Sequence, residues 1–207
     1  MVGLALHTSS PELGLAIGNS DGGARVQVWP LGRSLSTELH PHLAEFLSPQ
    51  RWSDLTFIAV AQGPGSFTGT RIGVVAARTL AQQLGVPLFG VSSLAAIAQQ
   101  CLDQAKLIAD GPIAVQMRAQ RGEYYGAIYQ PAPMGVESIL GDAVLSAEDW
   151  QHKLDTAPQS CQVWSAEDNL ANSVEAVLKL AWLRWHQGDR PDWSTVLPFY
   201  GQHPVSH

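Results

Sequence analysis

The sequence predicts an α/β fold in which helices flank a mixed sheet. Two short apolar runs, residues 2–6 and 13–17, stand on either side of a turn-like segment at 8–11 and are expected to pair as antiparallel strands. Residues 55–61 are almost continuously apolar, which is typical of a strand covered on both faces. A helical pattern and another apolar run follow, and the order strand, helix, strand favours parallel pairing in the middle of the sheet.

Between these strands the sequence predicts a third strand and a short helix. The third strand is expected over residues 25–28. Ser36 or Thr37 would cap the helix, and Pro41 is compatible with it only in the first turn. Ser48, which precedes a proline, is expected to end it. The apolar positions on one face of this helix are Leu39, Leu43, Phe46 and Leu47.

A glycine-rich segment at 63–71 joins the buried strand to a helix expected over residues 72–84, with Thr68 as its cap. Unpaired N–H groups at a helix N-terminus attract anions, so a phosphate site and a structural tight turn both remain open here. The spacing is neither that of a P-loop nor that of the dinucleotide fingerprint, because Thr68 stands where glycine is required.

Apolar and small residues surround most of the circumference of the helix at 72–84, with Gly73, Ala76 and Ala77 among them. Such a helix is either enclosed by its own lobe or covered on one side by a helix of another subunit. Both possibilities remain open. If a partner helix docks here, tryptophan at positions 76 and 77 is expected to abolish the complex and leave the monomer soluble.

The chain is long enough, at 207 residues, for one domain or two small lobes. A strand is expected over 86–91, followed by a helix capped by Ser92 or Ser93. The pattern changes after this helix. This change predicts a first lobe over residues 1–103 and a smaller second lobe over residues 104–207.

The second half of the chain shows fewer clear elements. Strands are expected at 113–117 and 123–129 around a tight turn, with a loop at 131–135. An apolar stripe at 174–185 is the best amphipathic helix pattern in the sequence, and its tryptophans are expected to be core residues.

Isolated histidines and arginines give weak signals for a chemical site. His40 and His42 are too close together to share one face of a helix, so a metal pair is not expected. His7 is expected to be structural, because no nucleophile can be assigned to it from spacing. Arg118 and Arg121 flank the predicted turn, where they either bind an anion or lie on a solvated surface.

Composition limits the class of protein. The 18 acidic and 12 basic side chains give a formal charge of -6, which opposes direct binding to nucleic acid. Charged residues make up only 14% of the chain, so much of the surface is expected to be either neutral polar or covered by a partner. Two cysteines fit a reducing cytosol, and neither a basic leader nor an apolar window of about 18 residues is present. The expected location is therefore cytoplasmic.

The glycine-rich block at 63–73 and the segment at 84–94 are the most specific motifs of the sequence. Weaker motifs occur at 4–9, at 121–125 and at 197–200. Together these motifs closely resemble the TsaB (YeaZ-like) family, and the resemblance spans most of the chain. It implies a two-lobed actin-like ATPase (ASKHA/RNase H-like) fold with a truncated second lobe.

The resemblance also implies that catalysis has been lost. Related ATPases usually place an aspartate for metal and phosphate at the end of the first strand, where this chain has His7. Arg118 stands where relatives often carry another aspartate. Neither side chain is a ligand for magnesium, which prefers hard oxygen donors. No catalytic, cofactor-binding or metal-binding residue is therefore expected.

The implied role is a non-catalytic scaffold in tRNA N6-threonylcarbamoyladenosine modification. Its partners would be a TsaD-type catalytic subunit, a TsaE-type ATPase and, when alone, a second copy; tRNA would be bound only through the complex, and no membrane is involved. The alternative is an active ASKHA-type ATPase or kinase, or a metallopeptidase-like enzyme. The residues expected to bind the partner are Leu39, Leu43, Phe46, Ile72, Gly73, Ala76, Ala77 and Leu80.

Overall fold

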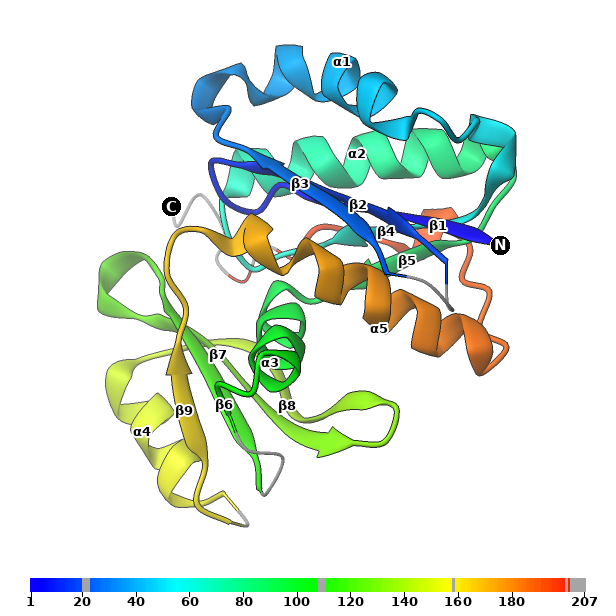
Figure 1. Cartoon of the computed structure of the whole chain (residues 1–207). Helices are drawn as coiled ribbons and strands as arrows, with labels where there is room; N and C mark the ends of the chain where they lie inside the picture. The colour runs from blue at the N-terminus through cyan, green and yellow to red at the C-terminus, as the bar shows by residue number, and fades with distance from the viewer. Residues whose placement is uncertain (20–22, 108–110, 158, 200, 202–207) are drawn as a thin grey trace.

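The computed structural model describes residues 1–19, 23–107, 111–157, 159–199 and 201 of the chain. Two sheets with flanking helices form two lobes (Figure 1). Among the described residues, no helix combines the length and the hydropathy that a membrane crossing requires.

The first sheet has five strands in the order β3, β2, β1, β4, β5. The first three are antiparallel, and β1, β4 and β5 are parallel, as the sequence predicts. Side chains of β1 alternate between the two faces, so Leu4 and Leu6 belong to one half of the core and Ala5 to the other. The strands are β1 (Val2–His7), β2 (Leu13–Gly18), β3 (Arg25–Trp29), β4 (Leu55–Ala61) and β5 (Leu88–Val91).

Helix α1 (Leu35–Leu47) covers one face of this sheet together with α2 (Figure 1). Ser36 and Thr37 lie inside α1, so the predicted cap at either position is wrong. Pro41 lies in the second turn of α1, not in the first. The helix tolerates it because Pro41 is exposed, and water can satisfy the carbonyl group that loses its N–H partner.

Helix α2 (Phe67–Leu84) starts five residues earlier than the apolar pattern indicated. Ser66, not Thr68, is the N-cap, and its hydroxyl accepts a hydrogen bond from the N–H of Gly69 at 3.3 Å. Thr68 lies in the first turn. The helix ends at Gly85, whose φ of 65° is the left-handed conformation expected of a C-cap glycine.

The second sheet has four strands in the order β8, β7, β6, β9. The predicted tight turn joins β6 to β7, but the loop expected at 131–135 is shorter, because β7 continues to Ala132 and β8 begins at Gly135. Helix α4 (Ala147–Asp155), which we did not predict, covers the outer face of this sheet through Trp150. The strands are β6 (Ile113–Arg118), β7 (Tyr124–Ala132), β8 (Gly135–Leu145) and β9 (Gln162–Ser165).

Two helices connect the lobes. Helix α3 (Ser93–Asp103) begins at its predicted cap, Ser92, and lies between the two sheets. Helix α5 (Val174–His186) matches the predicted stripe, and Trp182 packs edge to face on Phe57 of β4 with ring centroids 4.7 Å apart. A helix from the second half of the chain thus completes the core of the first sheet. The lobe boundary at residue 103 stays a prediction.

Candidate functional site

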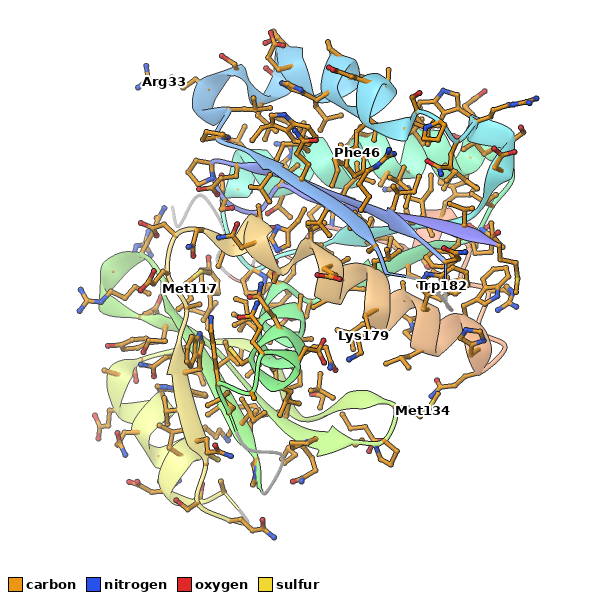
Figure 2. All side chains as sticks on the ribbon, viewed as in Figure 1. Arg33, Phe46, Met117, Met134, Lys179 and Trp182 are labelled. Atoms are coloured by element: carbon orange, nitrogen blue, oxygen red, sulfur yellow. The ribbon has the colours of Figure 1, made fainter. Side chains whose placement is uncertain are left out.

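A cleft of about 720 Å³ opens between the lobes, where β1, β4 and β6 end. The first lobe contributes the turn after β1 and the glycine-rich turn before α2. The second lobe contributes the end of β6, including Met117, which is labelled in Figure 2, and the turn between β6 and β7. Ser9, Ser66, Arg118, Arg121, Tyr125 and Phe199 are among the lining residues.

The glycine-rich turn packs tightly on the turn after β1. The N–H of Ser66 donates to the carbonyl oxygen of Ser9 at 2.7 Å, and the Thr8 hydroxyl donates to the carbonyl oxygen of Gly69 at 2.8 Å. A Cβ at Gly65 would lie 2.6 Å from the Ser9 Cβ, so only glycine allows this approach. The Ser66 N–H and the Thr8 hydroxyl are donors that could bind an anion, but these contacts already engage them. The glycine-rich segment therefore has a structural role.

His7 is the last residue of β1 and is fully buried. Its Nδ1 accepts a hydrogen bond from the N–H of Ser9 at 3.3 Å, while its Nε2 has no partner among the described residues. Burial lowers the pKa of His7 from 6.5 to about 3. The imidazole is therefore neutral at physiological pH and supplies neither a cation nor a carboxylate to the cleft.

The wall formed by the second lobe is basic at its rim. Arg118 and Arg121 are both exposed, and Arg121 has a left-handed φ of 58°. Asp168 is an acidic residue of the same wall. Within the described part of the chain, no group of three or more His, Cys, Asp or Glu side chains is placed to hold a metal ion.

A polar cluster joins helix α3 to the second sheet. The carboxylate of Asp142 accepts hydrogen bonds from the hydroxyls of Ser92 at 2.7 Å and Tyr129 at 3.1 Å. Burial raises the pKa of Asp142, although both hydrogen bonds oppose this shift. Ser92 also caps α3, so one side chain fixes a helix of the first lobe to two strands of the second.

Most of the residues predicted to bind a partner lie in the core of the chain itself. Leu39, Leu43 and Phe46 of α1 pack on the sheet and are at most 5% exposed. Gly73, Ala76 and Ala77 of α2 are buried as well, whereas Ile72 and Leu80 are partly exposed. Tryptophan at Ala77, which is fully buried, has no room in this structure and is no longer expected to leave the monomer intact.

A different face of α2 is open to solvent. Val75 is 60% exposed and Phe67 is 41% exposed, and Arg71 between them places its guanidinium 5.5 Å from the centre of the Phe67 ring. We call the exposed residues Phe67, Arg71, Val75, Thr79 and Gln82 the outer stripe of α2. We did not predict these five residues as a set. Its spacing of four, four, four and three residues was the available signal.

Comparisons with known proteins agree with this architecture. A family model described as TsaD, tRNA N6-adenosine threonylcarbamoyltransferase, matches residues 32–180. The tRNA threonylcarbamoyladenosine biosynthesis protein TsaB of Bacillus subtilis is 35% identical over 156 residues, which cover 73% of this chain and 65% of that protein. The chain thus spans just under two thirds of that relative. TsaB of Escherichia coli is 27% identical over 206 residues, covering 89% of this chain and 87% of that protein.

The solved structure of YeaZ from Pseudomonas aeruginosa is similar over almost the whole chain. It has a TM-score of 0.78 at 26% sequence identity and covers 96% of this chain and 99% of that one. The prediction of a two-lobed actin-like, RNase H-like α/β fold is confirmed. Tyr200, which is part of the C-terminal motif used for the resemblance, lies outside the described residues. By family model and by fold, the chain belongs to the TsaD family and is a TsaB (YeaZ-like) member of it.

Proposed function

We propose that this chain is a non-catalytic subunit in the biosynthesis of tRNA threonylcarbamoyladenosine and that it binds a TsaD-type catalytic subunit through the outer stripe of α2. The names of the relatives from Bacillus subtilis and Escherichia coli support the pathway. The match to the TsaD family model supports a partner of related fold, because related lobes present related helices.

The exposed valine on α2 carries the proposal. An aliphatic side chain that is 60% exposed in the middle of a long helix gains about 1 kcal/mol or more when a partner covers it. Phe67 and Arg71 extend the same face toward the cleft and are residue types enriched in protein interfaces. The stripe runs along the helix, which suits a partner helix packed beside it.

The side chains around the cleft support the absence of catalysis in this subunit. His7 is neutral and enclosed at the end of β1, and Arg118 is cationic at the end of β6. Neither supplies the oxygen ligands that magnesium requires at a phosphate-transfer site. The catalytic groups and the basic surface for tRNA would then belong to the partner, which is consistent with the net charge of -6 on this chain.

The proposal includes two further partners, which the family resemblance implies. In the absence of the TsaD-type subunit, a second copy of the chain would pack on the outer stripe, because the apolar face then has no other cover. A TsaE-type ATPase would join the assembled pair.

A pair of matched valine substitutions tests the proposal. Val75→Glu places a carboxylate in the middle of the outer stripe and is expected to weaken binding to the TsaD-type subunit at least tenfold, because the charge would be buried without a partner. Val163→Glu makes the same change at a 46% exposed valine of β9 in the second lobe and is expected to leave the affinity unchanged. Isothermal titration calorimetry measures both.

The possible outcomes distinguish a wrong docking surface from a wrong function. Equal affinities for the two variants, with the complex intact, would show that the partner docks elsewhere. Failure of the unsubstituted chain to bind the TsaD-type subunit would contradict the scaffold role. Nucleotide hydrolysis by the purified chain alone, lost on Gly65→Val, would favour the enzyme alternative.

A further inference from the structure

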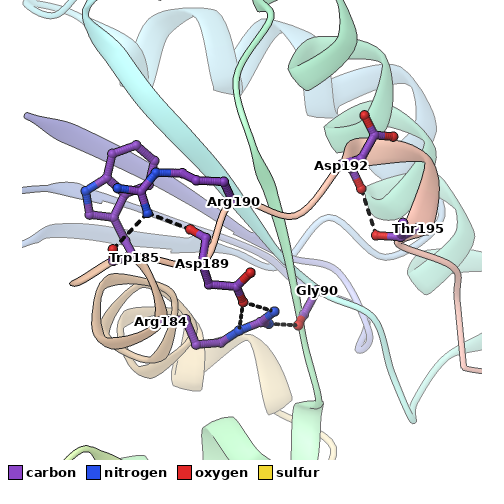
Figure 3. Close-up of polar contacts among 7 residues, drawn as sticks. All are labelled: Gly90, Arg184, Trp185, Asp189, Arg190, Asp192 and Thr195. Carbon is purple, nitrogen blue, oxygen red and sulfur yellow. Dashed lines mark hydrogen bonds and ion pairs between the residues drawn. The ribbon is translucent and has the colours of Figure 1, made fainter. Parts of the chain in front are cut away.

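The segment that follows α5 is held on the first lobe by a compact set of contacts (Figure 3). The Arg184 guanidinium pairs with the Asp189 carboxylate at 2.6 Å and donates to the carbonyl oxygen of Gly90 in β5 at 3.2 Å. The N–H of Leu88, also in β5, donates to the carbonyl oxygen of Pro191 at 3.2 Å. These contacts fix the path of the chain beside the edge of the first sheet.

The same segment then packs beside α2. Trp193 lies beneath the guanidinium of Arg78 in α2, which is 5.5 Å from the centre of the indole ring. Val196 is buried in the same core cluster as Ala77 of α2. Leu197 follows it and is 61% exposed. The segment thus presents a leucine to solvent on the part of the first lobe where α2 presents its outer stripe.

Two arginines of α2 have no carboxylate partner among the residues that the structure describes. Arg71 is exposed and lies over the ring of Phe67, and the half-buried Arg78 lies over the ring of Trp193. Helix α2 contains no aspartate or glutamate. In a chain with a net charge of -6, this face is therefore locally positive.

The acidic side chains of the neighbouring segment are engaged by other residues. The carboxylate of Asp189 pairs with Arg184. The carboxylate of Asp192 accepts a hydrogen bond from the N–H of Ser194 at 2.9 Å. The positive charge of α2 is thus left for carboxylates that come from outside the chain.

We propose that Phe67, Arg71, Val75 and Leu197 belong to one docking surface, and that this surface selects a partner helix with acidic side chains beside an apolar row. The inference rests on the proposed function and names the chemistry of its partner, because the TsaD-type subunit would present such a helix. Opposite charges across an interface favour the correct partner, and like charges disfavour others.

A second copy of the chain fits this surface less well. Pairing α2 with α2 brings Arg71 and Arg78 of both copies into one interface, and the helix has no acidic residue to meet them. The two positions are about 10 Å apart along the helix, which is about one Debye length at 0.1 M salt, so the charges of the two copies would repel each other.

The salt dependence of binding tests the charge of the partner. By isothermal titration calorimetry, the affinity for the TsaD-type subunit is expected to fall about tenfold between about 50 mM and about 500 mM salt, because salt screens the ion pairs. Arg71→Gln is expected to weaken binding about tenfold at the low salt concentration and to have little effect at the high one. Lys153→Gln removes the same charge from an exposed position of α4 and is expected to change neither value.

A leucine substitution tests whether the surface includes the segment after α5. Leu197→Ser is expected to weaken binding about fivefold at both salt concentrations, because the loss of apolar contact is not screened. Ile139→Ser is the matched control at a 44% exposed isoleucine of β8, and no effect is expected.

Self-association of the chain, measured by analytical ultracentrifugation, gives the opposite sign. It is expected to be at least about tenfold weaker than binding to the TsaD-type subunit at low salt, and to strengthen as salt screens the arginines. Self-association that weakens with salt would overturn the inference. A complex with the TsaD-type subunit that tolerates both salt and Arg71→Gln would overturn it and leave the proposed function intact, whereas the absence of any complex would contradict both.

Discussion

His7 occupies the end of β1 with its ring enclosed and its Nδ1 bonded to the backbone of Ser9. The folded chain binds a proton at this ring only near pH 3, whereas the unfolded chain binds one near pH 6.5. Between these values the unfolded state holds more protons, so the free energy of unfolding falls as the pH is lowered. The full contribution of a neutral His7 is present above pH 6.5 and is lost toward pH 3.

We therefore predict that the stability difference between the unsubstituted chain and His7→Asn depends on pH. The asparagine Oδ1 can replace Nδ1 as an acceptor for Ser9, but asparagine does not titrate. Relative to the variant, the unsubstituted chain should lose about 2 kcal/mol of unfolding free energy between pH 7.5 and pH 5. Urea unfolding at both pH values measures this change. Parallel losses in the two proteins would show that the histidine is not enclosed as described.

At the scale of elements, α2 has an inner face that packs on the sheet and an outer face that is exposed to solvent. Gly73 lies against Thr8 of the turn after β1, and Ala77 is fully buried. Small side chains on this face let the helix approach its own sheet closely. A small-residue face is thus explained without a foreign helix, and the large apolar residues of α2 that stay exposed for a partner are Phe67 and Val75.

Ala77→Trp tests that assignment of faces. Forcing an indole into the filled space beneath α2 is expected to lower the free energy of unfolding by about 3 kcal/mol or to prevent folding. Ala44→Trp, at an exposed position of α1, is expected to change it by less than about 0.5 kcal/mol. Chemical denaturation gives both values. A stable Ala77→Trp protein that loses only its partner would restore the original choice of interface residues.

The elements illustrate what periodicity predicts and what it omits. The apolar run of β4 and the stripe of α5 were predicted correctly, because burial on both faces and an amphipathic helix each leave a direct pattern. The start of α1 was missed. Proline usually fits only the first turn of a helix, so Pro41 indicated a later start, and the exposure that lets α1 tolerate it cannot be read from the sequence. The outer stripe of α2 was missed, because a helix that is apolar on most sides does not reveal which side meets its own sheet.

At the scale of the molecule, contacts distant in sequence hold the two lobes around the cleft. The Ser92 hydroxyl donates to the Asp142 carboxylate beside α3, and the N–H of Phe199 near the C-terminal end donates to the carbonyl oxygen of Gln62. The sequence indicated a change of pattern between the lobes, but not these connections, because they join segments without any local motif. Low charge over the whole chain, at 14%, is consistent with a surface partly covered in a complex.

The central claim, that the outer stripe of α2 is the partner surface, is tested most directly by thiol accessibility. Cysteine is placed at Val75 in one variant and at Val163 in another, and alkylation by iodoacetamide is followed by mass spectrometry with and without the TsaD-type subunit. We predict that the subunit slows alkylation at position 75 at least tenfold and leaves position 163 unchanged. Unaltered alkylation at position 75 in a complex that has demonstrably formed would contradict the account.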